Sequence, residues 1–124
     1  MTKCILIVDD EEDIRAITKM ALEMGTDWTI LTASSGSEAL EVAAASHPDT
    51  ILLDMMMPEM DGRATLKRLK ADAATQPIPV IMVTAKAQPS SLTEFEDLEV
   101  AAVLAKPFRP LKLAGEITAI LGWS

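Results

Sequence analysis

The chain has 124 residues, enough for one domain with a sizeable hydrophobic core. Its formal net charge of -8 argues against binding to nucleic acid or an anionic membrane through charge, and suits a hard cation such as Mg²⁺. No apolar run approaches the roughly 18 residues of a membrane span. The single cysteine, Cys4, fits a reducing compartment, and we expect a cytoplasmic protein.

The first strand and helix are predicted from the start of the chain. The run 4–8 is apolar and rich in β-branched residues, and it ends in Asp9 and Asp10. Acidic residues follow, which favour the first turn of a helix, and Gly25 marks the end of that helix. Within this segment Ile14, Ile17, Ala21 and Met24 recur at helical spacing.

The next segments repeat the pattern. A second strand is expected over 28–33, followed by Ser35 and Glu38, which have the form of a capping box at the start of a helix. That helix should end before Pro48, because proline disfavours helical backbone in the residue before it. The apolar run 51–54 then predicts a strand buried on both faces that ends in a carboxylate, Asp54.

The second half of the chain continues the alternation. Asp61 is predicted to be the N-cap of a helix that carries Ala64, Leu66 and Leu69. The run 80–83 is the fourth predicted strand and ends at Thr84, and a short helix is expected over 92–98. A weak fifth strand over 101–105 precedes a last helix, which begins at Pro110 and is closed by Gly122.

Five strands that alternate with helices indicate an α/β fold. Parallel strands need crossover connections, so the pattern predicts a five-stranded parallel sheet with helices on both faces, formed by a single domain over residues 1–124. The second strand contributes no charged residue at its end and is therefore expected at an edge of the sheet.

Polar side chains end four of the five predicted strands: Asp9 and Asp10, Asp54, Thr84, and Lys106. In an open parallel sheet, ligands bind beyond the carboxyl ends of the strands. Three neighbouring carboxylates repel one another unless a cation lies among them, so Asp10 and Asp54 are candidate Mg²⁺ ligands, with Asp9 holding a water. Thr84 and Lys106 suit phosphoryl oxygens, and Asp54 between the two groups could attack phosphorus and become an aspartyl phosphate.

These residues resemble the receiver domain of two-component response regulators, in order and spacing, along the whole chain. The motifs that carry the resemblance are Asp9-Asp10, Asp54 with Met57-Pro58, Met60-Asp61-Gly62, Thr84-Ala85 and Lys106-Pro107-Phe108. The resemblance implies a flavodoxin-like (βα)5 three-layer sandwich with strand order 2-1-3-4-5. It also implies a phosphoacceptor domain that assists its own phosphorylation and dephosphorylation, rather than an enzyme.

The resemblance implies specific roles for the residues at the strand ends. Asp10, Asp54 and the backbone carbonyl of Met56 would bind Mg²⁺ with help from Asp9, and Thr84 and Lys106 would bind the phosphoryl oxygens. The phosphodonor would be a sensor histidine kinase or a histidine phosphotransfer protein, and the output a downstream protein partner, without direct contact to nucleic acid or membrane.

Two departures from the family pattern concern how the domain passes on its signal and how long its phosphorylated form lasts. Val103 stands where the family usually has an aromatic residue that takes part in switching, so we expect the change to pass through residues 85–98 instead. Apolar Met56 could shield the phosphoryl group and lengthen the life of the phosphorylated form. The alternative function is a degenerate receiver that binds proteins without being phosphorylated; the intact acidic set argues against it.

Overall fold

The computed structural model describes residues 3–57, 60–84, 100–105 and 109–123. The elements in these ranges are β1 (Cys4–Val8), α1 (Glu12–Gly25), β2 (Thr29–Ala33), α2 (Gly36–Ser46), β3 (Thr50–Asp54), α3 (Gly62–Ala71), β4 (Val80–Thr84), β5 (Ala102–Ala105) and α5 (Pro110–Leu121). All five predicted strands are confirmed to within about a residue. The helix expected over 92–98 lies outside the described residues.

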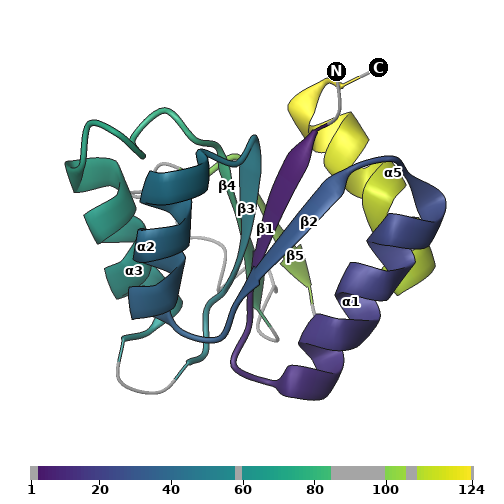
Figure 1. Cartoon of the computed structure of the whole chain (residues 1–124), viewed down its shortest axis with the longest axis horizontal. Helices are drawn as coiled ribbons and strands as arrows, with labels where there is room; N and C mark the ends of the chain where they lie inside the picture. Colours follow the sequence, from purple (N-terminus) through teal and green to yellow (C-terminus); the bar gives the residue numbers. More distant parts are fainter. Residues whose placement is uncertain (1–2, 58–59, 85–99, 106–108, 124) are drawn as a thin grey trace.

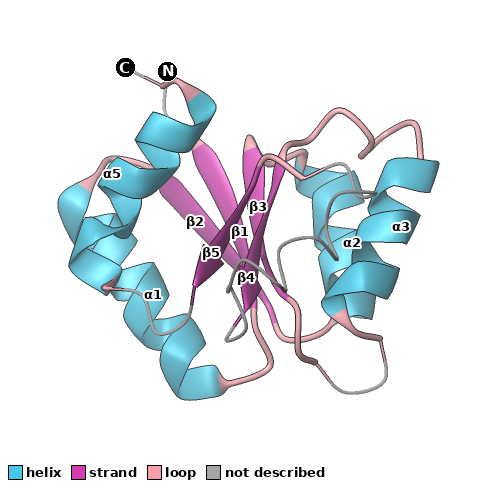
Figure 2. Ribbon diagram, turned by 180° about the vertical axis from the view of Figure 1, so that it is seen from behind, coloured by secondary structure: helices cyan, strands magenta, loops and turns pink. Residues whose placement is uncertain are grey.

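The five strands form one parallel sheet in the order β2-β1-β3-β4-β5, which places β2 at an edge as predicted. Helices α2 and α3 cover one face of this sheet, and α1 and α5 cover the other (Figures 1 and 2). The fold is therefore the predicted three-layer, flavodoxin-like α/β sandwich. All carboxyl ends of the strands lie at the same edge of the sheet, the lower edge in Figure 1.

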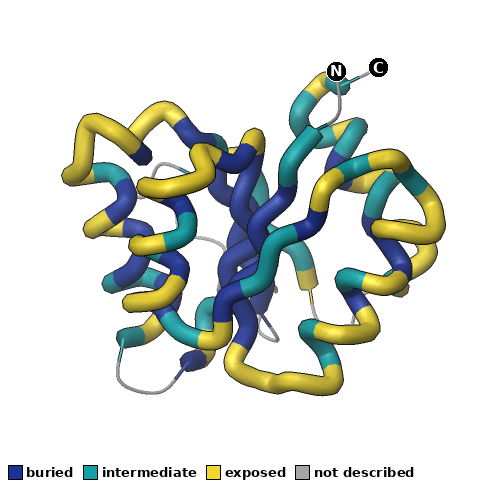
Figure 3. Tube along the Cα trace, viewed as in Figure 1, coloured by how far each residue is buried: buried dark blue, intermediate teal, exposed yellow. Residues whose placement is uncertain are grey.

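Two hydrophobic layers hold the helices to the sheet. Leu6, Leu53 and Met82 pack on the side of α2 and α3, whereas Ile7, Leu52 and Ile81 pack on the side of α1 and α5. Successive side chains of a strand point to opposite faces, so the central strands are buried on both sides (Figure 3). The continuous apolar runs in the sequence have this origin.

The predicted helix ends are largely confirmed. The Ser35 hydroxyl accepts a hydrogen bond from the Glu38 backbone N–H (3.1 Å), but the Glu38 carboxylate returns to the N–H of Ser34 (3.2 Å) instead of that of Ser35. In a standard capping box this carboxylate would accept from the N–H of Ser35, so the second hydrogen bond of the box is displaced by one residue. Asp61 caps α3 through the N–H of Ala64 (2.9 Å), as its position predicts.

The helix predicted from the spacing of Ile14, Ile17, Ala21 and Met24 is confirmed as α1, but two of these four residues lie on its exposed side. Ile17 is 54% exposed and Met24 is 74% exposed. The buried residues are instead Thr18, Ala21 and Leu22. Apolar side chains occur on both the inner and the outer side of this helix, so helical spacing alone allowed more than one choice of the inner face.

The amino-terminal edge of the sheet, opposite the predicted site, carries both tryptophans. The Trp28 and Trp123 rings meet edge to face with centroids 5.4 Å apart, and the Lys3 ammonium lies 4.9 Å from the Trp123 ring. Burial and the charge of Asp49 raise the pKa of the Cys4 thiol, which disfavours the reactive thiolate form.

Candidate phosphoacceptor and metal site

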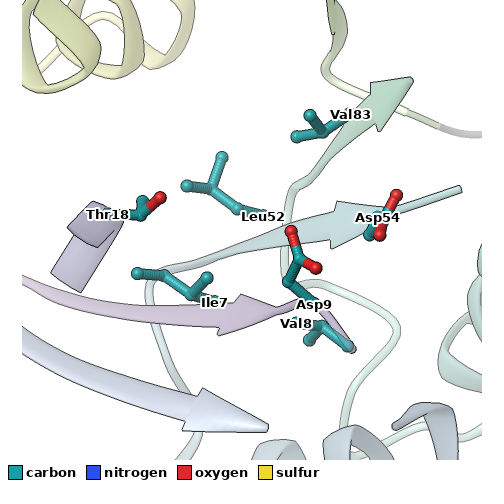
Figure 4. A pocket seen from close by; sticks show the side chains of 7 residues that line it. All are labelled: Ile7, Val8, Asp9, Thr18, Leu52, Asp54 and Val83. Atoms are coloured by element: carbon teal, nitrogen blue, oxygen red, sulfur yellow. The ribbon is translucent and has the colours of Figure 1, made fainter. Parts of the chain in front are cut away.

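The strand register brings the predicted acidic residues to one level at the carboxyl edge of the sheet. Val8 of β1 pairs with Leu53 of β3, so the next residues, Asp9 and Asp54, end neighbouring strands side by side. Figure 4 shows these two side chains at the ends of their strands. Thr84 ends β4 on the other side of β3, is 3% exposed, and pairs with Ala105 of β5.

Asp9, Asp10 and Asp54 form a compact cluster of carboxylates. One oxygen from each lies within 4.8 Å of the others, and Asp9 and Asp54 are buried while Asp10 is exposed. Carboxylate oxygens are the ligands that Mg²⁺ prefers, and a divalent cation would offset the repulsion among three negative charges. The donor set therefore fits Mg²⁺, with one side open to water.

Backbone hydrogen bonds hold Asp54 at the end of its strand. One oxygen of its carboxylate accepts from the backbone N–H of Met56 (3.1 Å). The N–H of Met55 donates to Val83 of β4 (2.9 Å), so the chain beyond Asp54 is still tied to the sheet. The side chain is thereby oriented before any ligand binds.

Gly62 allows the start of α3 to approach Asp54. Its N–H donates to the carbonyl oxygen of Met55 (3.0 Å). A Cβ atom at this position would lie 2.5 Å from the carbonyl oxygen of Asp54 and 2.7 Å from the Cα of Met55. The glycine of the Met60-Asp61-Gly62 motif is therefore required for space.

Hydrogen bonds to its side chain and to its backbone hold Asp9 in place. Its carboxylate accepts from the backbone N–H of Glu11 (2.9 Å), and its own N–H donates to the carbonyl of Ala33 in β2 (3.2 Å). The Arg15 guanidinium, one turn into α1, donates to the Asp9 carbonyl oxygen (2.8 Å). Sequence reasoning missed Arg15, although a basic residue after five consecutive acidic positions and one isoleucine was a usable signal.

Replacing Arg15 with methionine should lower the free energy of unfolding by about 1 kcal/mol, because the Asp9 carbonyl loses a donor and the acidic loop loses a nearby positive charge. Urea unfolding followed by tryptophan fluorescence measures this change. Lys67→Met removes the same charge from an exposed position of α3 and should shift stability by less than about 0.5 kcal/mol. Equal effects of the two substitutions would contradict the assigned role of Arg15.

The structure thus brings together four of the predicted site residues, Asp9, Asp10, Asp54 and Thr84. Met56 lies next to them, with its side chain 63% exposed. Lys106 follows Ala105 at the end of β5 but lies outside the described residues, as do residues 85–98 of the predicted output segment.

Comparison with known proteins identifies the family to which the chain belongs. A family model for the response regulator receiver domain matches residues 5–118. The chain therefore belongs to the receiver-domain family of response regulators, the proteins of two-component signalling.

Relatives and solved structures support this assignment. The chain is 41% identical over 121 residues to the phosphate regulon transcriptional regulatory protein PhoB of Pseudomonas aeruginosa, covering 96% of this chain and 52% of PhoB. It is 36% identical to the alkaline phosphatase synthesis transcriptional regulatory protein PhoP of Bacillus subtilis, covering 98% and 49%. The chain thus spans about half the length of these relatives. The chemotaxis protein CheY4 of Vibrio cholerae superposes with a TM-score of 0.88 at 28% identity, covering 97% of this chain and 99% of CheY4.

Among the described helices, none combines the length and the apolar character that crossing a membrane requires. The expected cytoplasmic location stays a prediction.

Proposed function

We propose that residues 1–124 form a single receiver domain that accepts a phosphoryl group on Asp54 in a Mg²⁺-dependent reaction. The observation that carries this proposal is the cluster of Asp9, Asp10 and Asp54, in which a buried carboxylate ends the central strand beside two others. A carboxylate in this place can act both as a metal ligand and as a nucleophile.

In the proposed reaction, a carboxylate oxygen of Asp54 attacks the phosphorus of a phosphohistidine on a partner protein. The new O–P bond forms as the P–N bond breaks, and the departing imidazole keeps the electron pair and takes up a proton from water. Mg²⁺ held by Asp10, Asp54 and the Met56 carbonyl, with help from Asp9, would neutralise charge on the phosphoryl oxygens. The Thr84 hydroxyl would donate a hydrogen bond to the same oxygens, and the Lys106 ammonium would attract them through its positive charge.

The proposed donor is a sensor histidine kinase or a histidine phosphotransfer protein, and the phosphorylated domain would change its binding to a downstream protein. Two features of the chain favour a protein partner over DNA for this domain itself: its net charge of -8 and its match to about half the length of two longer regulators.

Phosphotransfer from a panel of purified, radiolabelled histidine kinases tests the proposal. We expect at least one kinase to label the wild-type chain rapidly and none to label Asp54→Ala. If no kinase and no small-molecule phosphodonor labels the folded wild-type protein, the degenerate receiver is the better description. Retained labelling of Asp54→Ala would show that another residue accepts the phosphoryl group.

Met56 should set the lifetime of the phosphorylated form. Its backbone N–H bonds to Asp54, which places its exposed, apolar side chain beside the proposed acyl phosphate. Met56→Asn keeps the backbone donor and adds a polar group that can hold water, so dephosphorylation should become several-fold faster. Loss of label over time measures this rate. Met24→Asn, a matched change at an exposed position of α1, should leave it unchanged, and an unchanged rate in Met56→Asn would refute the shielding role.

A further inference from the structure

A small cavity, about 10 Å³ in volume, lies between the acidic cluster and helix α1 (Figure 4). Its walls are mostly apolar side chains of β1, β3 and β4, and three polar residues line it: Asp9, Asp54 and Thr18. Asp9 and Asp54 follow Ile7 and Leu52 by two positions along their strands, and those residues face α1 and α5. The cavity therefore lies next to the carboxylate cluster, on the face of the sheet that α1 covers.

Thr18 is a polar residue in the buried face of α1. It is 1% exposed, and its neighbours in that face are the apolar Ala21 and Leu22. Figure 4 shows its hydroxyl on the side of the helix that faces Leu52 and the two carboxylates. The helical spacing of apolar residues does not predict a threonine in the buried face of this helix.

The hydroxyl of Thr18 differs from those of other threonines in the fold. Thr26, Thr65 and Thr118 each donate to the carbonyl oxygen four residues earlier, at 2.7, 2.9 and 2.8 Å. Within the described part of the chain, the Thr18 hydroxyl makes no such bond. Every side-chain oxygen or nitrogen there that is completely buried has a hydrogen-bond partner, so the Thr18 oxygen is not completely buried. The space next to this oxygen is the cavity.

The volume and the lining of the cavity suit one water molecule. A volume of this order is about the minimum that a water requires, and a buried water needs two to four polar partners. The hydroxyl of Thr18 supplies one. The Asp9 carboxylate also lines the cavity, and a carboxylate can accept several hydrogen bonds at once, so it can supply a second partner.

We propose that this cavity holds one ordered water that links the Thr18 hydroxyl to the Asp9 carboxylate. Thr18 is then a positioning residue: through the water, it fixes the orientation of Asp9 within the carboxylate cluster. The water site depends on the cavity, on Thr18 and on the Asp9 carboxylate, and it does not require a bound metal. The consequence for Mg²⁺ rests on the proposed function of the cluster.

Two substitutions separate the hydroxyl from the shape of the side chain. Thr18→Val keeps the volume and removes the hydroxyl, whereas Thr18→Ser keeps the hydroxyl and removes a methyl group. Magnetisation transfer from long-lived bound water, measured by NMR, detects the water in each protein, and a crystal structure of each confirms its place. Calorimetric titration with MgCl₂ measures the metal affinity of the same samples.

We expect the water in wild type and Thr18→Ser and its loss in Thr18→Val, with Mg²⁺ affinity lowered about 10-fold in Thr18→Val alone, as for other outer-shell partners of metal ligands. A wild-type cavity without water, or an equally occupied one in Thr18→Val, would overturn the water site. Loss of the water with unchanged Mg²⁺ affinity would overturn the positioning role. If wild type bound no Mg²⁺, the proposed function would fail, while the NMR result would still decide the water site.

Discussion

Replacing Asp10 with asparagine should weaken Mg²⁺ binding by about 100-fold, because the cluster loses a charged ligand on its exposed side. In metal-free protein the same substitution should raise the free energy of unfolding by about 1 kcal/mol. The three carboxylates have oxygens within 4.8 Å of one another, and two like charges at that distance repel by about 1 kcal/mol in water. One substitution thus impairs binding and stabilises the metal-free fold.

Unfolding in urea, with and without MgCl₂, measures both effects. Mg²⁺ at about 100 times its dissociation constant should stabilise the wild-type protein by about 2.7 kcal/mol, and a chelator should remove that gain. At the same Mg²⁺ concentration, which equals the dissociation constant of a 100-fold weaker site, Asp10→Asn should gain only about 0.4 kcal/mol. The tryptophans report unfolding without direct interference from the metal, since Trp28 directly precedes β2, at the opposite edge of the sheet, and Trp123 packs against it.

Asp13→Asn is the matched control for Asp10→Asn. Asp13 is an exposed acid in the first turn of α1, where the helix dipole favours a negative charge. Its loss should lower stability by a few tenths of a kcal/mol and leave Mg²⁺ affinity nearly unchanged. The assignment of the cluster fails if both variants change stability in the same direction and bind Mg²⁺ equally well.

Replacing Gly62 with alanine should destabilise the fold by about 3 kcal/mol. The added methyl group would meet the backbone of Asp54 at 2.5 Å and that of Met55 at 2.7 Å, so either α3 or the end of β3 must move. Because that movement displaces Asp54, phosphorylation by acetyl phosphate should also slow under conditions where the variant remains folded.

Gly115→Ala provides the control of opposite sign. Gly115 lies within α5, and a Cβ atom there meets nothing within 4 Å. Alanine is the better helix former, so this variant should gain about 0.5–1 kcal/mol. Thermal unfolding of both variants gives the comparison, and a Gly62→Ala protein as stable as wild type would contradict the close approach of α3 to the strand end.

The sequence was sufficient to predict the sheet and the cluster for a physical reason. Each central strand is an unbroken apolar run, and the residue that ends the run is charged or polar, so β1 and β3 identify both their own limits and the positions of Asp9 and Asp54. The order of the strands came from the family resemblance, because alternation alone indicates a parallel sheet without specifying its order.

Details that depend on contacts between distant segments could not be predicted. Helical spacing did not identify the inner face of α1, because the exposed Ile17 and Met24 are more apolar than the buried Thr18. The roles of Arg15 and Thr18 arise from their positions against β1 and the cavity, which helical spacing does not reveal. The role of Lys106 stays a prediction.

The most direct test of Asp54 as the phosphoacceptor is to locate the phosphoryl group on the chain. The wild-type protein would be incubated with acetyl phosphate and Mg²⁺, the acyl phosphate trapped by borohydride reduction, and the modified peptide sequenced by mass spectrometry. We predict one modified residue, Asp54, and no modification when a chelator replaces Mg²⁺. Modification of Asp9, Asp10 or any other residue in its place, or an unmodified protein in the presence of Mg²⁺, would contradict the assignment of Asp54 as the phosphoacceptor.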